Sequence, residues 1–258
     1  MIVPDLRGYG ATSAPESVAA YRMKTLAQDL IDLLDYLKIE QAVFLGHDWG
    51  GALVYRVCLY HPTRVVGVGS ICTPYFPPMS QYVSLEKIVE RNPAFRYQLH
   101  FQSDEAATLL EVNPKAFFIN LFRERVSPKV LYGQAYRHVT PDSTLISEEE
   151  IDYYANTYSK RSFRGPLNWY RTRALDFEDE KDLDPMIRLP VLYIGAELDP
   201  VLPPALSKGM ETFLPNLTRA PTLKHSGHWA LWTEPDTVNA ILQNWLQTLQ
   251  HYRGNSRL

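Results

Sequence analysis

Three short apolar runs recur along the chain and restrict its fold more than any other feature. QAVFLG (41–46), VVGVGSIC (65–72) and PVLYIG (190–195) are almost free of polar residues. Runs of this kind are typical of parallel strands with both faces buried. A further strand is expected at MIVPDL (1–6), and an amphipathic stretch after it predicts a helix with five leucines on one face: Leu26, Leu30, Leu33, Leu34 and Leu37. Strand, helix and strand therefore alternate, which predicts a mostly parallel α/β sheet.

The middle of the chain has a different pattern. From about Ser80 to Glu180, aromatic-rich amphipathic segments such as AFFINLFRER and EEEIDYYANTY alternate with proline-containing breaks. The strand pattern then resumes at PVLYIG, a further strand is expected near LTRAPTL, and TVNAILQNWLQTLQHY predicts a closing helix. We therefore expect a discontinuous core of residues 1–79 and 181–258 with a helical lid inserted at 80–180.

Composition and charge narrow the classes of molecule that the protein is expected to bind. Apolar residues make up 45% of 258 residues, and no stretch approaches the roughly 20 uncharged apolar residues of a membrane span. The N-terminus lacks the layout of a secretory signal. The net charge of −3, with both signs interspersed, favours a neutral small molecule over nucleic acid or a membrane surface. Cys58 and Cys72 are expected to be buried thiols, and no Cys/His cluster is spaced for a metal.

The last three residues are Ser256, Arg257 and Leu258. They resemble the Ser-Lys-Leu type of peroxisomal address, with arginine in place of lysine. We therefore expect a peroxisomal or cytoplasmic location, with an import receptor as the partner of this tripeptide.

The segment FLGHDWGGALVYRV carries the first candidate for catalysis. Gly46 and Gly50 flank Asp48 at a strand-to-helix junction, and small residues at these places allow a strained turn that exposes the central side chain. A carboxylate is ionised at pH 7 and can attack a saturated carbon without a base, which forms an ester. Asp48 is therefore the predicted nucleophile. Its alternative role is an N-cap of the following helix, and His47 is expected to pack behind the turn.

Cleavage of that ester requires a base for water, which is usually a histidine oriented by a carboxylate. In α/β-hydrolases these residues follow the nucleophile in the order acid, then histidine. Asp199 comes just after PVLYIG, and His228 lies in a glycine-flanked loop before the last helix. Glu197 and His225 are the alternatives.

At this point the chain resembles the soluble epoxide hydrolase family of the α/β-hydrolase superfamily. The resemblance runs through PDLRGYGATSAP, GHDWGG, GHW and two lid segments, FRYQLHFQ and RGPLNWYR. It implies that Tyr97 and Tyr170 bind the oxide of an opening epoxide, and that the backbone N–H of Trp49 belongs to the oxyanion hole. The implied reaction converts an apolar epoxide and water to a vicinal diol without a cofactor.

The family also carries a His-Gly-x-Pro loop upstream of PDLRGYG, which supplies a second oxyanion donor. The sequence starts after this point, so we expect the first strands of the usual sheet to be absent. A longer natural chain, a sheet that closes differently and a weak catalyst are the three explanations. Loss of one such donor costs about 10²–10³ in rate, so the present chain is expected to hydrolyse its ester slowly.

Two rival functions remain open. A haloalkane dehalogenase uses the same aspartate and often a neighbouring tryptophan, here Trp49, but a halide leaves without a proton and gives Tyr97 and Tyr170 no catalytic task. The rival from another class is a hydrolase-like binding or scaffold protein with little or no activity.

Overall fold

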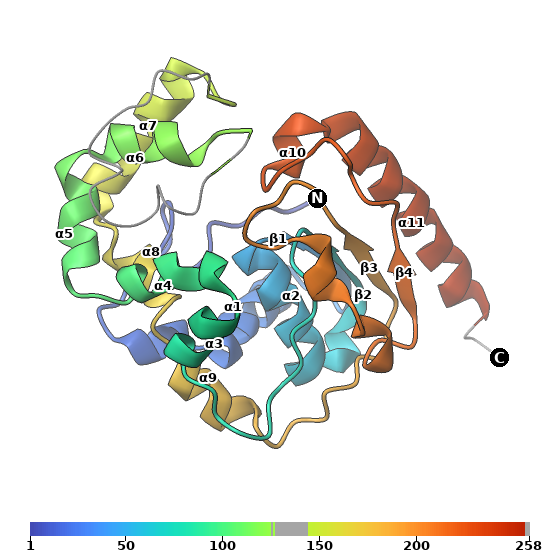
Figure 1. Ribbon diagram of the computed structural model, residues 1–258. Coiled ribbons are helices and arrows are strands. Elements are labelled where there is room, and N and C mark those ends of the chain that lie inside the picture. The colour runs from blue at the N-terminus through green and yellow to red at the C-terminus, as the bar shows by residue number, and fades with distance from the viewer. Residues whose placement is uncertain (125, 127–143, 256–258) are drawn as a thin grey trace. The chain divides into compact units, whose positions relative to one another are not determined.

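The computed structural model describes residues 1–124, 126 and 144–255 (Figure 1). Contacts divide the chain into two compact units. The helical unit comprises Met1–Leu26 and Met79–Lys181, and the sheet unit comprises Ala27–Pro78 and Asp182–Leu258. The predicted peroxisomal tripeptide lies outside the described residues. Within the described part of the chain, no helix is both long and apolar enough to cross a membrane.

The sheet unit is built on four parallel strands in the order β1-β2-β3-β4. Their bounds are β1 (Ala42–His47), β2 (Val65–Ile71), β3 (Val191–Ile194) and β4 (Leu217–Arg219). Each coincides with a predicted apolar run or with the strand expected near LTRAPTL, so the parallel α/β sheet is confirmed. β1 lies at the edge of this sheet as described, with the Leu45 side chain 40% exposed.

Helices cover both faces of the sheet. A Cβ on Gly67 would touch side chains of α11 (Pro235–Asn255), whereas the hydroxyl of Ser70 lies against Gly51 of α2 (Trp49–Tyr60). Odd and even residues of a strand point to opposite faces. Gly67 and Ser70 of β2 differ in parity, so α11 and α2 pack on opposite faces.

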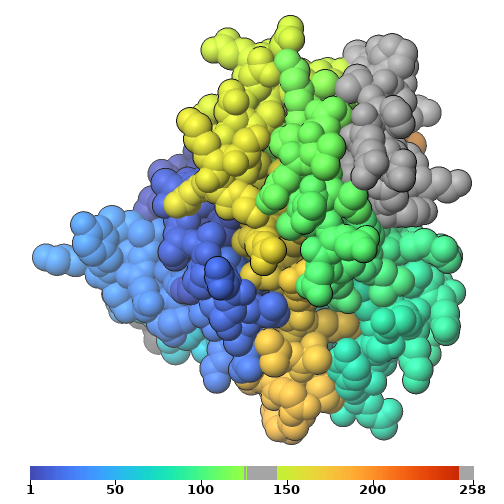
Figure 2. Space-filling model, turned by 90° about the vertical axis from the view of Figure 1, so that its left-hand side faces the viewer, coloured from blue at the N-terminus to red at the C-terminus, as the bar shows by residue number. Residues whose placement is uncertain are grey.

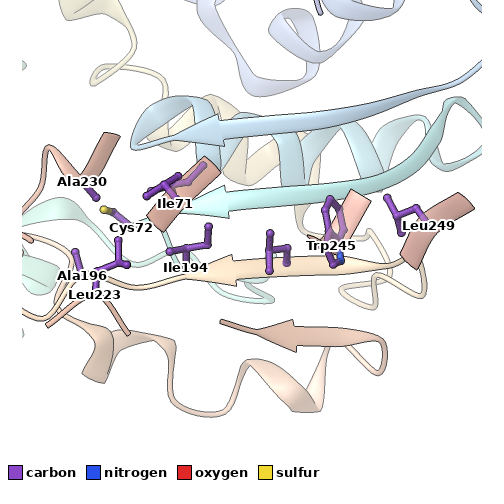
Figure 3. Close-up of a cluster of buried hydrophobic side chains, with 10 residues drawn as sticks. Ile71, Cys72, Ile194, Ala196, Leu223, Ala230, Trp245 and Leu249 are labelled. Atoms are coloured by element: carbon purple, nitrogen blue, oxygen red, sulfur yellow. The ribbon is translucent and has the colours of Figure 1, made fainter. Parts of the chain in front are cut away.

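A buried apolar cluster joins α11 to the sheet and continues to the ends of the strands (Figure 3). It consists of Ile71, Cys72, Leu192, Ile194, Ala196, Leu223, Ala230, Val238, Trp245 and Leu249. Burial of one large aliphatic side chain contributes about 1.5–3 kcal/mol. Because four of these residues (Cys72, Ala196, Leu223 and Ala230) lie beyond the strands or in α10, the core also anchors the loops that follow the sheet.

Short helices complete the sheet unit. They are η2 (Pro62–Arg64), η6 (Pro204–Ser207), η7 (Met210–Thr212) and α10 (Ala230–Thr233). The predicted leucine-rich helix is α1 (Met23–Tyr36), which crosses from one unit to the other. Leu26 and Leu34 are buried on it as expected, but Leu37 lies beyond its end and is 39% exposed.

Within the described residues, the helical unit contains nine complete helical elements. Eight of them are η1 (Val18–Tyr21), α3 (Leu85–Arg91), η3 (Pro93–Phe95), α4 (Arg96–Phe101), α5 (Glu105–Val112), α6 (Pro114–Leu121), α7 (Glu148–Arg161) and α8 (Arg164–Asn168), and α9 (Arg173–Glu180) is the ninth. Ser147 and Glu150 form a capping box that starts α7. Ring contacts between α6, α7 and Phe163 form the interior of this unit, with Tyr158 and Phe163 centroids 4.9 Å apart.

The strand predicted at MIVPDL is wrong, because residues 1–6 form no strand. The Asp5 carboxylate instead accepts a hydrogen bond from the Ala11 amide at 3.0 Å, and Gly8 and Gly10 have positive φ. Within the helical unit, this turn packs against α8 and the residues after it, where the Trp169 indole N–H donates to the Arg7 carbonyl at 3.0 Å. Figure 2 shows the blue first residues against the yellow of α7 and α8. Local hydrogen bonds thus satisfy backbone groups that would otherwise need a neighbouring strand.

These contacts place residues 1–26 in one compact unit with 79–181, whereas the predicted core contained residues 1–79. Compactness measures packing and does not identify an insertion in the chain. The division into a core and an inserted lid therefore stays a prediction.

Candidate active site

The turn between β1 and α2 presents the Asp48 side chain. Asp48 has φ 51° and ψ −119°, a conformation that residues other than glycine rarely adopt. Its carboxylate makes no capping hydrogen bond to α2, although it occupies the N-cap position. The structure therefore does not support a helix-capping role for Asp48, and strained backbone at such a place is typical of functional sites.

Two glycines make this turn possible. A Cβ on Gly46 would overlap the backbone carbonyl of Gly50, and one on Gly51 would lie 2.8 Å from the Cβ of Thr73. A Cβ on Gly50 would meet nothing within 4 Å. Gly50 was expected to be the second sterically required glycine, but the close contact involves Gly51.

Asp199 and His228 are joined by a hydrogen bond between Oδ2 and Nδ1 at 2.9 Å. The other carboxylate oxygen of Asp199 accepts the backbone amides of Val201 and Leu202, both at 2.9 Å. Because a carboxylate oxygen can only accept, Nδ1 of His228 carries the proton when the ring is neutral. The ring then offers Nε2 as a base, and this atom lies 3.6 Å from Oδ1 of Asp48.

The pKa values follow from these contacts. Burial by itself would raise the pKa of Asp199, but the hydrogen bond to His228, the His228 charge and the two amides hold that pKa below its usual range. Burial would lower the pKa of His228, but the hydrogen bond to Asp199 and the charges of Asp48 and Asp199 raise it above its usual value. The pair therefore stabilises a proton on His228.

The two alternatives from the sequence lie elsewhere. Glu197 and His225 are both exposed, whereas the Asp199 side chain is fully buried. Backbone hydrogen bonds explain why Asp199 and His228 meet: the Glu197 amide donates to the Leu223 carbonyl at 2.9 Å, and the Leu198 amide to the Ser226 carbonyl at 3.0 Å. The loop that carries Asp199 and the loop that carries His228 thus run side by side.

Two supporting residues lie at this end of the sheet. The Thr73 hydroxyl donates to the Asp48 carbonyl at 2.7 Å and so stabilises the strained turn. His47 Nε2 lies 2.7 Å from the His228 carbonyl. Thr73 was not among the predicted residues, although a polar residue just after a strand-like run is a usable signal. His47 was expected only to pack behind the turn.

Tyr97 and Tyr170 meet within the helical unit. Tyr97 is a buried residue of α4, and Tyr170 lies just after α8. Their ring centroids are 6.0 Å apart at 78°, and each ring also contacts Phe101. The Gln102 side chain donates to the Tyr170 carbonyl at 2.6 Å. The two predicted phenols therefore form one aromatic group.

Trp49 is the first residue of α2, where backbone N–H groups point out of the helix N-terminus. Among the described residues, no group of three or more His, Cys, Asp or Glu side chains could hold a metal ion.

Comparison with known proteins shows the family to which the chain belongs. The chain matches the alpha/beta hydrolase fold family over residues 1–235. It is 39% identical over 260 residues to Bifunctional epoxide hydrolase 2 of Sus scrofa, covering 96% of this chain and 46% of that protein. It is 34% identical to Epoxide hydrolase srdG of Neurospora crassa, covering 96% of this chain and 78% of that protein. The chain thus spans about half the length of the mammalian relatives that it matches.

Solved structures show the same likeness. The crystal structure of Epoxide Hydrolase A from Mycobacterium thermoresistibile is 30% identical, with a TM-score of 0.82, and the match covers 95% of this chain and 81% of that one. The chain belongs to the α/β-hydrolase family and, within it, to the epoxide hydrolases.

Proposed function

We propose that this protein hydrolyses an epoxide to a vicinal diol through a covalent ester of Asp48. One observation carries the proposal: a carboxylate held on a strained turn faces Nε2 of a histidine whose Nδ1 is bonded to a buried aspartate. An aspartate in the position of the nucleophile, here Asp48, suits attack on a saturated carbon, which a serine triad does not perform. The names of the relatives favour an epoxide over other electrophiles.

The first step opens the ring. A carboxylate oxygen of Asp48 bonds to one epoxide carbon, and the bond from that carbon to the oxirane oxygen breaks. The alkoxide needs a hydrogen bond and then a proton as it forms, which Tyr97 and Tyr170 would supply. The contact between the two rings, with centroids 6.0 Å apart, supports a shared role for the two phenols.

The second step cleaves the ester. His228 Nε2 takes a proton from water, the hydroxide adds to the ester carbonyl of Asp48, and the Trp49 amide would stabilise the oxyanion. Collapse expels the diol oxygen, which takes the proton from His228. The Asp48 carboxylic acid then loses its proton, which passes through solvent to the tyrosine that protonated the alkoxide. This transfer restores both the carboxylate and the phenol. Atoms and charges then balance for one epoxide and one water.

Exposed apolar side chains lie near the acid and the base: one precedes Asp199 in the chain, and another packs against Trp229, whose ring contacts His228. Leu198 precedes Asp199 and is 37% exposed, and Trp232 in α10 is 40% exposed. Exposed apolar residues beside polar groups are typical of sites for apolar ligands. We therefore infer that the substrate is a small apolar epoxide.

The test measures diol formation from an aryl epoxide. Asp48→Ala should lower turnover on the order of 10⁴-fold or more, because the nucleophile is removed. A single turnover in ¹⁸O-water should place the label in the peptide that carries Asp48, since water attacks the ester carbonyl. Label in the diol alone, or full activity of the variant, would overturn the mechanism. Binding of the epoxide without turnover would favour a binding protein.

For a protein that ends at Leu258, we also propose import into peroxisomes through Ser256, Arg257 and Leu258. A fluorescent fusion should lose peroxisomal localisation when these three residues are removed. An unchanged distribution of the fusion in the cell would exclude a targeting role for this tripeptide.

A further inference from the structure

The backbone carbonyl of His228 accepts hydrogen bonds from two side chains at the ends of neighbouring strands. His47 Nε2 is 2.7 Å from this oxygen, and the Cys72 thiol donates to it at 3.5 Å. His47 is the last residue of β1, and Cys72 directly follows β2. Cys72 is fully buried and has φ 63°, a backbone conformation that few residues other than glycine adopt. This conformation sets the direction of its thiol toward the His228 carbonyl.

The acceptor determines the tautomer of His47. A carbonyl oxygen only accepts, so the proton of a neutral His47 must be on Nε2. Burial, followed by the nearby charge of His228, lowers the pKa of His47 to about 4. His47 is therefore a neutral donor at physiological pH, and burial keeps the Cys72 thiol protonated by raising its pKa well above the usual value.

We propose that His47 and Cys72 are positioning residues that hold the main chain of His228, so that its ring stands between Asp199 and Asp48. This inference rests on the proposed function, because it concerns the same base. The Asp199 bond at 2.9 Å orients the ring from one end only. The two donors add a second constraint, which acts on the main chain of His228 at its carbonyl.

A neutral His47 also favours the protonation of His228 during ester hydrolysis. His228 gains a proton during ester hydrolysis, and its ring centroid is only 4.7 Å from that of His47. A second cation at this distance would oppose that gain. The charged groups that act on His47 are His228, Asp48 and Asp199, and the two carboxylates only partly offset its burial.

A pair of variants tests the positioning role. His47→Leu removes the donor, whereas His47→Gln keeps an N–H donor without a titratable ring. We expect His47→Leu to slow ester hydrolysis by about 10- to 100-fold through misplacement of the base, with ring opening changed by less than about threefold. The ester should then accumulate, which intact mass detects as an increase equal to the mass of the epoxide. His47→Gln should restore most of the hydrolysis rate.

The matched control is His225→Gln, since His225 is an exposed histidine in the same loop. It should hydrolyse the ester at the wild-type rate. Cys72→Ala should slow ester hydrolysis by a few-fold, because an S–H donor is weak. Equal loss of ring opening and hydrolysis in His47→Leu would indicate a merely structural role and would overturn the proposal.

A measurement on the wild-type protein separates this inference from the proposed function. Nitrogen-15 NMR of the histidine rings should show His47 as the Nε2–H tautomer, with no titration between about pH 5.5 and 8. This result is expected even if the chain makes no ester. An Nδ1–H tautomer, or titration near the ordinary histidine pKa, would refute the positioning role. A wild-type protein that forms neither ester nor diol would refute the proposed function instead.

Discussion

The sheet unit and the helical unit hold their candidate functional residues by different means. Asp48, Asp199 and His228 are fixed through the backbone: a positive φ, two amide hydrogen bonds and a carbonyl that accepts two donors. Tyr97 and Tyr170 contact each other and Phe101 through their rings, and they accept hydrogen bonds from the side chains of Gln98 and Gln102. The first arrangement has little freedom to relax, whereas the second can adjust its side chains.

This difference suits the two steps. Proton transfer between His228 and water depends on angles and distances within a few tenths of an ångström, which the backbone provides. Stabilisation of an alkoxide needs donors of the right kind, and packed aromatic rings can place them against substrates of different shape. Substitutions should therefore cause abrupt losses in the sheet unit and graded losses in the helical unit.

The largest effect is expected for Gly46→Ala. Its Cβ would overlap the Gly50 carbonyl, which is backbone and cannot rotate away. We expect a loss of about 3 kcal/mol in the free energy of unfolding, and loss of diol formation. Gly50→Ala is the matched control, because nothing lies within 4 Å of its Cβ, and it should unfold at the wild-type urea midpoint. Equal midpoints for the two variants would show that the turn is not under steric control.

Asp199→Asn should have the next largest effect. The amides of Val201 and Leu202 can still bond to the Asn oxygen, so the fold should be retained. The amide group stabilises the wrong tautomer of His228, and we expect ester hydrolysis to fall by about 10³- to 10⁴-fold.

The pH profile of this variant is a separate readout. His228 acts as a base only when unprotonated, and its pKa is raised in the wild type. Esterification removes the Asp48 charge, but the hydrogen bond and charge of Asp199 still raise the His228 pKa. Ester hydrolysis by the wild type should therefore increase with pH through the pKa of His228. Loss of the Asp199 charge should move the midpoint of this increase to lower pH. A midpoint that stays in place would mean that another group is the base.

Tyr170→Phe should cause a smaller loss, on the order of 10- to 100-fold in ring opening, because Tyr97 remains as a donor. The aromatic packing with Phe101 is preserved, so stability should change little. Release of halide from a chloroalkane provides the second assay. Faster halide release than diol formation, with no loss in Tyr170→Phe, would favour a haloalkane dehalogenase.

The smallest effect is expected for Gln102→Leu. It removes the 2.6 Å bond to the Tyr170 carbonyl, which contributes about 1 kcal/mol to stability. Ring opening should slow by only a few-fold, since ring packing still holds Tyr170. Ser159→Ala on α7, which removes an exposed side-chain bond to the Ala155 carbonyl, should leave ring opening unchanged. A loss as large as that of Tyr170→Phe would show that the tyrosine pair depends on one backbone contact.

Sequence patterns predicted the sheet well and the start of the chain badly. Apolar runs at β1, β2 and β3 are local signals of burial on two faces, and they translate directly into strands. The segment MIVPDL has a similar apolar pattern, but it forms no strand, and the turn at Asp5–Ala11 packs within the helical unit. Local pattern could not reveal this, because a strand depends on a neighbour to satisfy its amides.

The sequence by itself determined the parallel α/β architecture, the position of Asp48 on a strand-to-helix turn and the order of acid and histidine after it. Only the tertiary structure showed that Asp199, and not Glu197, is hydrogen-bonded to His228. It also brought the two tyrosines into one aromatic group and placed Gly51 against the side chain of Thr73. The reason is physical. Turn residues and apolar periodicity act between neighbours in the chain, whereas burial, hydrogen-bond partners and steric contact depend on segments that meet only after folding.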